Sequence, residues 1–383
     1  MAQEKGVAAE GKDLRTLFLD GQNKICPAVA TAEGYHLTQQ ITGSLRPGCF
    51  LMADDLHRSF FINKPLSSEG AQVDCTTVQI QQKEGFFMKE QTIFQGVATA
   101  LVTPLTKDGV NYDAFRKLIE WQIGQGINAL VICGTTGESS TLTDEEHREV
   151  LKFAAEVTNG RVPLIAGTGS NDTAYAIELT QFACEIGYDA MLVVTPYYNK
   201  TTQKGLVAMF SAIADASTKP VILYNVPSRT GVNIEPATYA ALAEHPNIWA
   251  IKEANGNLSK IVETAALVGD KLDIYSGNDD QIVPLLACGG KGVISVLSNV
   301  LPKESVEICN RYFAGDVAGA MELQKKYLPL INALFSEVNP IPVKAAMAAM
   351  GYCENYLRLP LVPMEQAHYD HLLKCMKDAG VNV

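Results

Sequence analysis

The chain has 383 residues, of which 47% are hydrophobic and 19% are charged, a composition typical of a globular protein. Its formal net charge of −11 at pH 7 argues against nucleic acid and anionic membrane surfaces as partners, because both attract basic patches. No apolar stretch approaches the ~18 residues of a membrane-spanning helix, and the N-terminus has neither the apolar core of a signal peptide nor the acid-poor composition of a transit peptide.

Residues 1–87 show no sustained period of helix or strand. A disordered or loosely packed extension and a regulatory module both fit this pattern. A third hypothesis starts from QQKEGFF, which stands just before Met88. Lys-Glu-Gly can be encoded as AAG-GAG-GGN, which resembles a bacterial ribosome-binding site ahead of an ATG codon. On this hypothesis the protein starts at Met88, and residues 1–87 are translated upstream sequence.

From about residue 95 onward, one unit repeats along the chain: a short apolar run ends in a turn, and an amphipathic helical pattern follows. Helical segments such as NYDAFRKLIEWQIGQG have Asp or Asn near the start and often Gly at the end. The apolar runs are GVATALVTP (96–104), ALVICGTTG (129–137), PLIAGTG (163–169), AMLVVTP (190–196), PVILYNVP (220–227), IWAIKEA (248–254), DIYSGND (273–279) and GVISV (292–296).

Eight strand–helix units at a spacing of roughly 25–30 residues predict an α/β protein, namely a closed (β/α)8 TIM barrel over residues 88–313. An open doubly wound sheet is the alternative. That fold usually carries a Gly-rich phosphate turn after its first strand, and LVTPLTKDG is not such a turn. More helical pattern follows the eighth run than one unit needs, so we expect a C-terminal helical region at residues 314–383.

Nine cysteines are scattered singly, at positions 26, 49, 75, 133, 184, 288, 309, 353 and 375, and no two form a CxxC pair. Paired or clustered spacing would indicate a disulfide framework or a zinc site. This pattern instead favours reduced thiols in a cytoplasmic protein.

Polar and reactive residues follow the predicted strands, at the end where barrel enzymes build their active sites. These stretches are GTTGE (134–138), PYYN (196–199), YN (224–225) with PSRTG (227–231), Lys252, and SGND (276–279). We therefore expect a functional site at the C-terminal ends of the strands.

Lys252 is the most informative of these residues, because it stands at the end of an apolar strand pattern, IWAIK. A free lysine has a pKa of about 10.4, and desolvation inside a barrel lowers that value. The neutral amine is a nucleophile that forms a Schiff base with a carbonyl, without a metal or a flavin. The alternative is a lysine that reaches solvent or pairs with Glu253. Because adjacent strand residues face opposite sides, Glu253 does not share its pocket.

Four further side chains fit chemistry around such an amine. Tyr224, on the strand before Lys252, can move protons, although an aromatic packed at the barrel rim is the alternative. Thr135 and Thr136 stand at a predicted helix N-terminus and suit a carboxylate, or cap the helix. Arg229 suits a second carboxylate through its planar fork, or is a solvated surface arginine.

The motifs resemble those of the dihydrodipicolinate synthase family, also called 4-hydroxy-tetrahydrodipicolinate synthases. The resemblance covers about residues 93–380. It rests on GTTGES (134–139), VTPYYNK (194–200), YNVPSRTG (224–231), IKEANGN (251–257), SGND (276–279) and GVISV (292–296), all in the family's order and spacing.

The resemblance implies a lyase of the Schiff-base pyruvate-aldolase type that needs no cofactor and no metal. Lys252 matches the lysine that forms a Schiff base with pyruvate, and the enamine attacks L-aspartate 4-semialdehyde on the route to diaminopimelate and lysine. Thr135, Tyr224 and Tyr198 match the proton-relay triad, with the tyrosine equivalent to Tyr198 supplied by a neighbouring subunit. The family usually forms a homotetramer, a dimer of tight dimers.

Further residues match the family's binding sites. Thr136 matches the contact to the pyruvate carboxylate, and Arg229 matches the arginine that holds the semialdehyde carboxylate. Gly277 and Ile294 match positions that line the lysine pocket. Residues of a lysine-effector site in the dimer interface are matched by Ser139, His147, Asn171 and Tyr197.

The effector site departs from the family pattern at two positions. Tyr175 stands where lysine-sensitive members often have a glutamate, and Asp144 stands where some have a histidine. The loss of a carboxylate removes a partner for the effector's ammonium group, so we expect weak or absent inhibition by lysine.

Two other functions are compatible with a barrel of this kind. A sister pyruvate aldolase, such as N-acetylneuraminate lyase or a keto-sugar-acid aldolase, shares the lysine and the tyrosine but lacks the arginine of PSRTG, here Arg229. A catalytically dead barrel acting as a sensor or scaffold predicts the loss of Lys252, Tyr224 or the threonines. Because all of these are present, the sequence favours the synthase.

Overall fold

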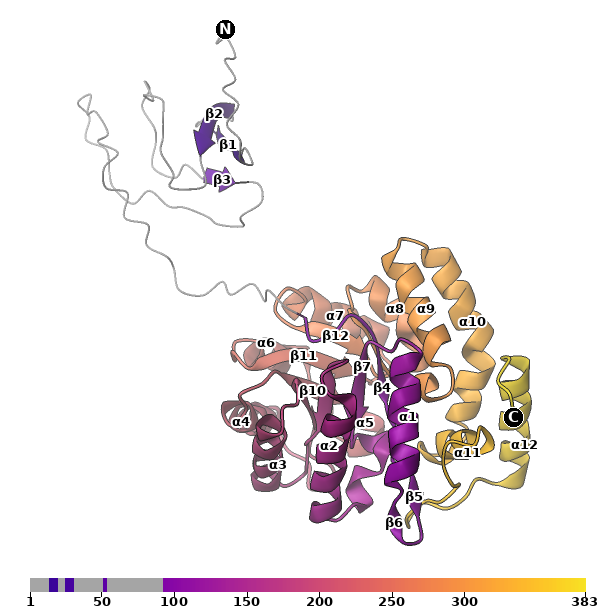
Figure 1. The fold of residues 1–383 in the computed structure, drawn as a ribbon. Coiled ribbons are helices and arrows are strands. Elements are labelled where there is room, and N and C mark those ends of the chain that lie inside the picture. Colours follow the sequence, from indigo (N-terminus) through magenta and orange to yellow (C-terminus); the bar gives the residue numbers. More distant parts are fainter. Residues whose placement is uncertain (1–13, 20–24, 31–50, 54–91) are drawn as a thin grey trace, which may run out of the picture. The chain divides into compact units, whose positions relative to one another are not determined.

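The structure, a computed structural model, describes residues 14–19, 25–30, 51–53 and 92–383 (Figure 1). The chain divides into two compact units, Met1–Phe86 and Phe87–Val383. In the first unit, an antiparallel sheet has the order β2-β1-β3, with strands at Leu14–Leu19 (β1), Ile25–Ala30 (β2) and Leu51–Ala53 (β3). The rest of the 1–87 extension and the hypothesis of a start at Met88 lie outside the described residues. The domain bounds at 87/88 and 313/314 stay predictions.

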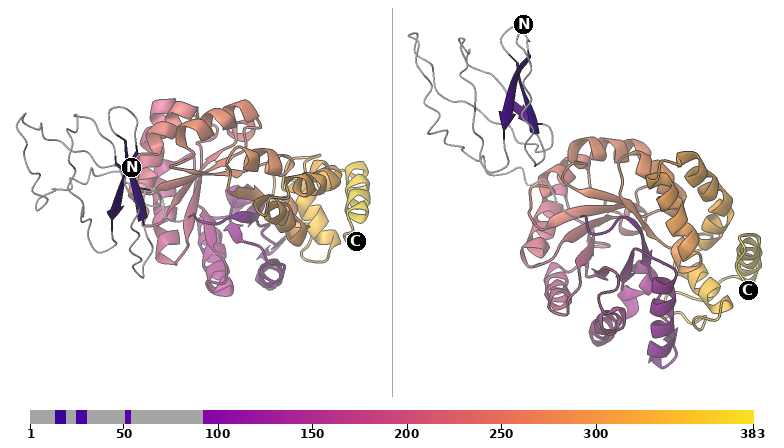
Figure 2. Two further views of the ribbon diagram at one scale, coloured as in Figure 1. Left: turned by 90° about the horizontal axis from the view of Figure 1, so that it is seen from above. Right: turned by 45° about the horizontal axis from the view of Figure 1, so that its top comes forward.

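The second unit contains the predicted closed barrel of eight parallel strands (Figure 2). The strands follow each other around the barrel in chain order, and the last pairs with the first. They are β4 Gly96–Ala100, β7 Ala129–Ile132, β8 Leu164–Gly167, β9 Ala190–Val194, β10 Val221–Asn225, β11 Ile248–Glu253, β12 Asp273–Ser276 and β13 Gly292–Ser295. Every predicted apolar run contains one of these strands, so the (β/α)8 prediction is confirmed.

The barrel closes at a seam where two backbones come unusually close. In the pairing of β13 with β4, Gly292 stands opposite Gly96. A Cβ atom on Gly292 would lie 1.9 Å from the carbonyl oxygen of Gly96, and Gly292 has a φ of +155°. Only glycine fits this position, because any side chain would push the two strands apart.

Helices surround the strands on the outside, as the view in Figure 2 shows. Many of them begin where the sequence offers a polar side chain to the first free N–H groups. Examples are Asn111, Thr143, Asp172, Thr202 and Asn257. The helices around the barrel are α1 Tyr112–Gly124, α2 Asp144–Thr158, α3 Thr173–Glu185, α4 Gln203–Asp215, α5 Pro227–Thr230, α6 Pro236–Leu242, α7 Leu258–Val268, α8 Ile282–Ala287 and α9 Pro302–Phe313.

Short elements fill some connections, and helices continue beyond the eighth unit. A two-stranded hairpin, Leu105–Thr106 (β5) and Gly109–Val110 (β6), follows β4. Beyond α9 lie α10 Val317–Leu334, α11 Ile341–Ala349 and α12 Gln366–Asp378, which fall in the predicted C-terminal helical region. Among the described residues, every helix is too short or too polar to cross a lipid bilayer.

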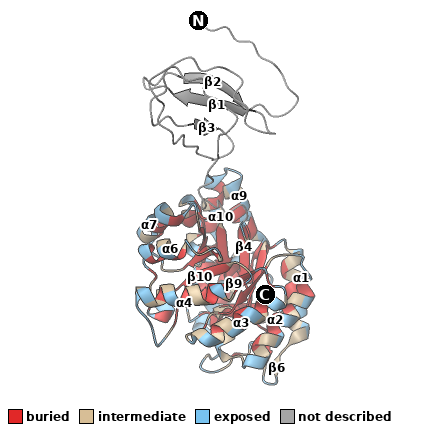
Figure 3. Cartoon of the chain, turned by 90° about the vertical axis from the view of Figure 1, so that its left-hand side faces the viewer, coloured by how far each residue is buried: buried red, intermediate tan, exposed pale blue. Residues whose placement is uncertain are grey.

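The barrel has an apolar interior and a second apolar layer between the strands and the helices. The strands are buried while the outer faces of the helices are exposed (Figure 3). Inside the barrel, Ala98, Val131, Ile165 and Ile222 pack with Tyr224 and Tyr275. A polar group placed among these residues loses its contact with water, and this desolvation shifts the pKa of an ionisable group.

Candidate active site

Lys252 and Tyr224 are neighbours on adjacent parallel strands. The register of β10 and β11 pairs Tyr224 directly with Lys252, and the Lys252 Nζ atom lies 4.2 Å from the centroid of the Tyr224 ring. Both residues are buried, with 6% of Lys252 and 7% of Tyr224 exposed. The amine predicted to react is thus removed from solvent and lies against a phenol.

Burial changes the protonation of this amine. Desolvation lowers the pKa of Lys252 to about 7, the charge of Asp279 opposes the shift, and the charge of Arg229 adds to it. A large fraction of the amine is therefore neutral at neutral pH, whereas an ordinary lysine is almost fully charged. A neutral amine carries the lone pair that attacks a carbonyl carbon.

Tyr224 is connected to Thr135. Burial raises the pKa of Tyr224, and the charge of Arg229 and a hydrogen bond with the Thr135 side chain offset part of the rise. Thr135 begins a single 3-10 turn, Thr135–Gly137 (η1), shortly after β7. The phenol therefore stays protonated at neutral pH and can pass protons between the amine and the Thr135 hydroxyl.

The two predicted carboxylate-binding residues both bond to one residue that the sequence did not single out. Asn339 lies between α10 and α11 and is buried. The Asn339 side chain donates from Nδ2 to Thr136 Oγ1 over 3.0 Å, and the backbone carbonyl oxygen of Asn339 accepts from Arg229 Nη2 over 3.0 Å. The C-terminal helical region thus orders the predicted substrate-binding side chains. No motif marked Asn339, because it lies far from both partners in the sequence.

Gly277 stands next to Lys252, and Ile294 lies inside the barrel. A Cβ atom on Gly277 would stand 2.7 Å from Ala254 Cβ and 3.2 Å from Lys252 Cε. The absence of a side chain at Gly277 therefore leaves room for the lysine. Ile294, on β13, belongs to the same interior apolar cluster as Tyr224 and is 1% exposed.

Asp279 has a role at the site that the sequence marked only as part of the SGND stretch. Its Oδ2 atom accepts from the backbone N–H groups of Val296 and Leu297, each over 2.9 Å, and this orders the end of β13. Burial raises the pKa of the Asp279 carboxyl. In the sequence, the signal for this residue was its position just after the strand β12.

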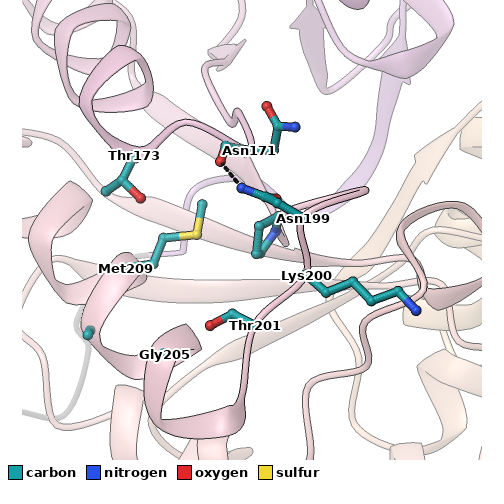
Figure 4. A pocket seen from close by; sticks show the side chains of 9 residues that line it. Asn171, Thr173, Asn199, Lys200, Thr201, Gly205 and Met209 are labelled. Atoms are coloured by element: carbon teal, nitrogen blue, oxygen red, sulfur yellow. Dashed lines mark hydrogen bonds between the residues drawn. The ribbon is translucent and has the colours of Figure 1, made fainter.

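Tyr198 differs from the other predicted catalytic residues, because it is 92% exposed. Its φ of 70° and the φ of 53° at Lys200 are left-handed, which is uncommon outside glycine. Asn199 Nδ2 donates to the carbonyl of Asn171 over 2.9 Å, as Figure 4 shows, and holds this loop. A cavity of about 420 Å³ lies beside it, lined in part by Asn171, Thr201 and Met209.

The predicted effector residues lie near this loop, in a 3-10 turn after β7 and on α2. Asn171 Nδ2 donates to the carbonyl of Tyr197 over 3.1 Å, and Ser139 begins the 3-10 turn Ser139–Thr141 (η2). His147 Nε2 donates to the carbonyl of Gly167 over 3.0 Å. Burial lowers the pKa of His147 to about 4, so this imidazole is neutral at pH 7.

The two residues that depart from the family pattern contact each other. Tyr175 and Asp144 share a side-chain hydrogen bond. Asp144 also forms an ion pair with Arg148, with Nε 2.9 Å from Oδ2. Burial, together with the bond to Asp144, raises the pKa of Tyr175 to about 12. The carboxylate at this place is therefore already bound within the chain.

Comparisons with known proteins show which family the chain resembles. The model of the "Dihydrodipicolinate synthetase family" matches residues 93–379. The 4-hydroxy-tetrahydrodipicolinate synthase of Clostridium perfringens (strain 13 / Type A) is 55% identical over 289 residues, which are 76% of this chain and 99% of that protein. The protein of the same name from Acetivibrio thermocellus is 53% identical over 289 residues, 76% of this chain and 98% of that protein.

The solved structures show the same likeness. The chloride-inhibited dihydrodipicolinate synthase from Acinetobacter baumannii, complexed with pyruvate, is 47% identical and superposes with a TM-score of 0.74. The match covers 76% of this chain and 100% of that one. On the family match and these identities, the chain belongs to the dihydrodipicolinate synthetase family.

Proposed function

We propose that this chain is a 4-hydroxy-tetrahydrodipicolinate synthase in which Lys252 forms a Schiff base with pyruvate and L-aspartate 4-semialdehyde is the second substrate. The observation that carries the proposal is the buried Lys252 amine, whose pKa is lowered to about 7 and which lies 4.2 Å from the Tyr224 ring. The named relatives at 55% and 53% identity support this activity over that of a sister aldolase.

The reaction needs a nucleophile and a path for protons, and the site supplies both. The neutral amine of Lys252 attacks the keto carbon of pyruvate, and the keto oxygen leaves as water after it is protonated. Loss of a proton from the methyl group then gives the enamine, whose carbon attacks the aldehyde carbon of the semialdehyde. The amino group of the semialdehyde then attacks the imine carbon, which closes the ring and releases the Lys252 amine. Tyr224 and Thr135, joined by a hydrogen bond, carry protons to and from these atoms.

The two carboxylates of the substrates require separate donors. Thr136, held by Asn339, binds the pyruvate carboxylate, and Arg229 binds the carboxylate of the semialdehyde. A guanidinium suits this second task because its planar fork donates two parallel hydrogen bonds. Gly277 and Ile294 shape the space around the lysine.

The proposed assembly is a homotetramer, a dimer of dimers, in which Tyr198 of one subunit completes the relay of its neighbour. Its 92% exposure supports this, because a catalytic tyrosine that faces water on its own chain needs a partner surface. Large apolar side chains exposed on α7, namely Leu258, Val262 and Leu267, offer a second interface. The free thiols among the described residues, such as Cys133 and Cys309, favour the cytoplasm.

Trapping with borohydride tests the function. Incubation with pyruvate and sodium borohydride is expected to add one reduced pyruvate to the chain, at Lys252 and nowhere else. Lys252→Met is the control and is expected to gain no mass. A parent protein without the mass gain would refute the Schiff-base mechanism, and turnover with other aldehydes but not with aspartate semialdehyde would point to a sister aldolase.

A further inference from the structure

The two strands that carry Lys252 and Tyr224 have a second polar pair on their outer face. The register that pairs Tyr224 with Lys252 also pairs Asn225 with Glu253, one residue further along. Successive strand side chains point to opposite faces, so this second pair turns away from the amine and toward the helices. Glu253 is 2% exposed and Asn225 is fully buried. A carboxyl group in such surroundings is costly unless it is hydrogen-bonded.

Glu253 is hydrogen-bonded at both oxygens. Oε1 accepts from Asn225 Nδ2 over 3.0 Å and from the backbone N–H of Asn255 over 2.8 Å. Oε2 accepts from the hydroxyl of Tyr239, on α6, over 2.8 Å and from Asn225 Nδ2 over 3.2 Å. One side chain therefore ties together β10, the end of β11 and α6.

The backbone of Glu253 extends this connection to the next strand. Its carbonyl oxygen accepts from the N–H of Gly277 over 2.7 Å, directly after β12. Asn225 is fixed as well, because its Oδ1 accepts from the N–H of Ile234 over 3.1 Å and its Nδ2 also donates to Asn233 Oδ1 over 2.9 Å. Lys252 directly precedes this fixed point, so its backbone cannot shift unless Glu253 shifts too.

We propose that Glu253 is a positioning residue for the Schiff-base lysine. Its carboxyl group keeps β10 and β11 in register and ties α6 to them, and this fixes the Lys252 amine against the Tyr224 phenol. The proposal rests on the proposed role of Lys252. It differs from a purely structural role because a displacement of reacting groups by about 1 Å can cost about 100-fold in rate. Loss of Glu253 is thus expected to slow imine formation beyond what a loss of stability explains.

The test compares two tyrosines that are matched in burial and that each donate one buried hydrogen bond. The Tyr239 hydroxyl donates to Glu253, whereas the hydroxyl of Tyr188, two residues before β9, donates to the carbonyl of Leu151 over 2.9 Å. Both tyrosines are fully buried. Tyr239→Phe and Tyr188→Phe therefore each remove one buried hydrogen bond and no volume beyond a hydroxyl. Tyr188→Phe is therefore the control for the loss of stability that Tyr239→Phe causes.

Two readouts are measured on the full-length protein: the rate of borohydride trapping at saturating pyruvate, and the midpoint of thermal unfolding. We expect Glu253→Ala to slow trapping by about 100-fold and Tyr239→Phe by about 3-fold. Glu253→Gln is expected to lie between them, because its carbonyl oxygen keeps two donors and the Tyr239 hydroxyl can turn to accept from the amide. Tyr188→Phe is expected to lower the midpoint by as much as Tyr239→Phe and to trap pyruvate at the parent rate.

Several results would overturn the proposal. One is trapping at the parent rate in both Glu253→Gln and Tyr239→Phe. Another is equal slowing in Tyr188→Phe, which would assign the effect to stability. If Glu253→Ala does not fold, the trapping rates of Glu253→Gln and Tyr239→Phe are compared with that of Tyr188→Phe. This comparison decides between a positioning role and an effect of stability. A parent protein that traps no pyruvate would refute the proposed function itself, and the positioning role with it.

Discussion

Lys344 donates a 2.6 Å hydrogen bond from Nζ to Glu138 Oε1, and the two side chains are 0% and 1% exposed. Lys344 lies on α11, whereas Glu138 follows Thr135 and Thr136 in the turn after β7. The second carboxylate oxygen of Glu138 accepts from the backbone N–H of Arg358 over 3.1 Å. The C-terminal helical region therefore holds the turn that presents the two threonines.

Breaking this ion pair is expected to cost much of the stability of the chain. Lys344→Met leaves the charge of Glu138 buried without its partner, which typically costs about 3–5 kcal/mol. The free energy of unfolding in urea measures this, and activity should fall with it because the threonine turn loses its support. Lys260→Met is the control, since Lys260 pairs with Glu263 on the surface and should change stability little. A Lys344→Met protein as stable as the parent would contradict the prediction.

The rate of imine formation is expected to rise with pH through about 7. The neutral amine is the reactive form, and the pKa of Lys252 is about 7, so the rate should fall about tenfold for each pH unit below that value. Arg229→Met removes a charge that lowers this pKa, so its profile should move to higher pH. Asp279→Asn removes the opposing charge and should move the profile to lower pH. Stopped-flow measurement with pyruvate over about pH 5 to 9 tests all three, and a flat profile in the parent would contradict them.

Lys252→Met is expected to be inactive and more stable than the parent. Because the pKa of Lys252 in the folded protein, about 7, lies below its ordinary value of 10.5, the lysine costs nothing above pH 10.5. Its cost grows as pH falls and is complete below pH 7, where a shift of this size is worth about 5 kcal/mol. Urea unfolding at pH 6 and pH 9 should show a gain for Lys252→Met that is larger at pH 6. A gain that is equal at both pH values would contradict this origin.

Mixing two inactive variants tests whether Tyr198 acts across a subunit boundary. In a mixed dimer of Lys252→Met and Tyr198→Phe chains, one of the two sites has both an intact lysine and an intact tyrosine. Activity should therefore return after the two variants are dissociated and reassembled together. Each variant treated alone in the same way is the control. No recovery, with mixed dimers shown by native mass spectrometry, would place Tyr198 in the site of its own chain or outside the chemistry.

Inhibition by lysine is expected to be weak or absent. Asp144 is bound by Arg148 and Tyr175, so it is a poor partner for the ammonium group of an effector. Tyr175→Glu restores a carboxylate at the position that departs from the family pattern and should strengthen inhibition. Activity measured against lysine concentration tests this, with Tyr175→Gln as a control of similar size without charge. Sub-millimolar inhibition of the parent would refute the prediction.

Local patterns were sufficient to predict most of the barrel. The strand at Ile248–Glu253 begins at the residue where the apolar run IWAIKEA begins, and the strand at Gly292–Ser295 ends one residue before the end of GVISV. Apolar runs bounded by turn residues mark a buried parallel strand whatever it packs against. The placement of Lys252 beside Tyr224 also followed from order alone, because consecutive strands of such a barrel are neighbours.

The contacts from the C-terminal region could not be predicted in this way. Asn339 bonds to Thr136, and Lys344 to Glu138, across about half of the chain. No local period reports such pairs, because they depend on how α11 packs against the barrel. A lone lysine in the apolar stretch IPVKAAMAAM was the one local signal, since a buried charge requires a partner.

The seam between β4 and β13 has a consequence for the order of events on the ribosome. β4 is the first strand of the ring to be synthesised, yet one of its two neighbours, β13, is the last. Until Gly292 reaches Gly96, the ring is open between β12 and β4, and water has access to the barrel interior where Lys252 lies. We therefore expect the Lys252 amine of a nascent chain to have a basicity close to that of a free lysine, and to become reactive toward keto acids only when translation has supplied the final strand.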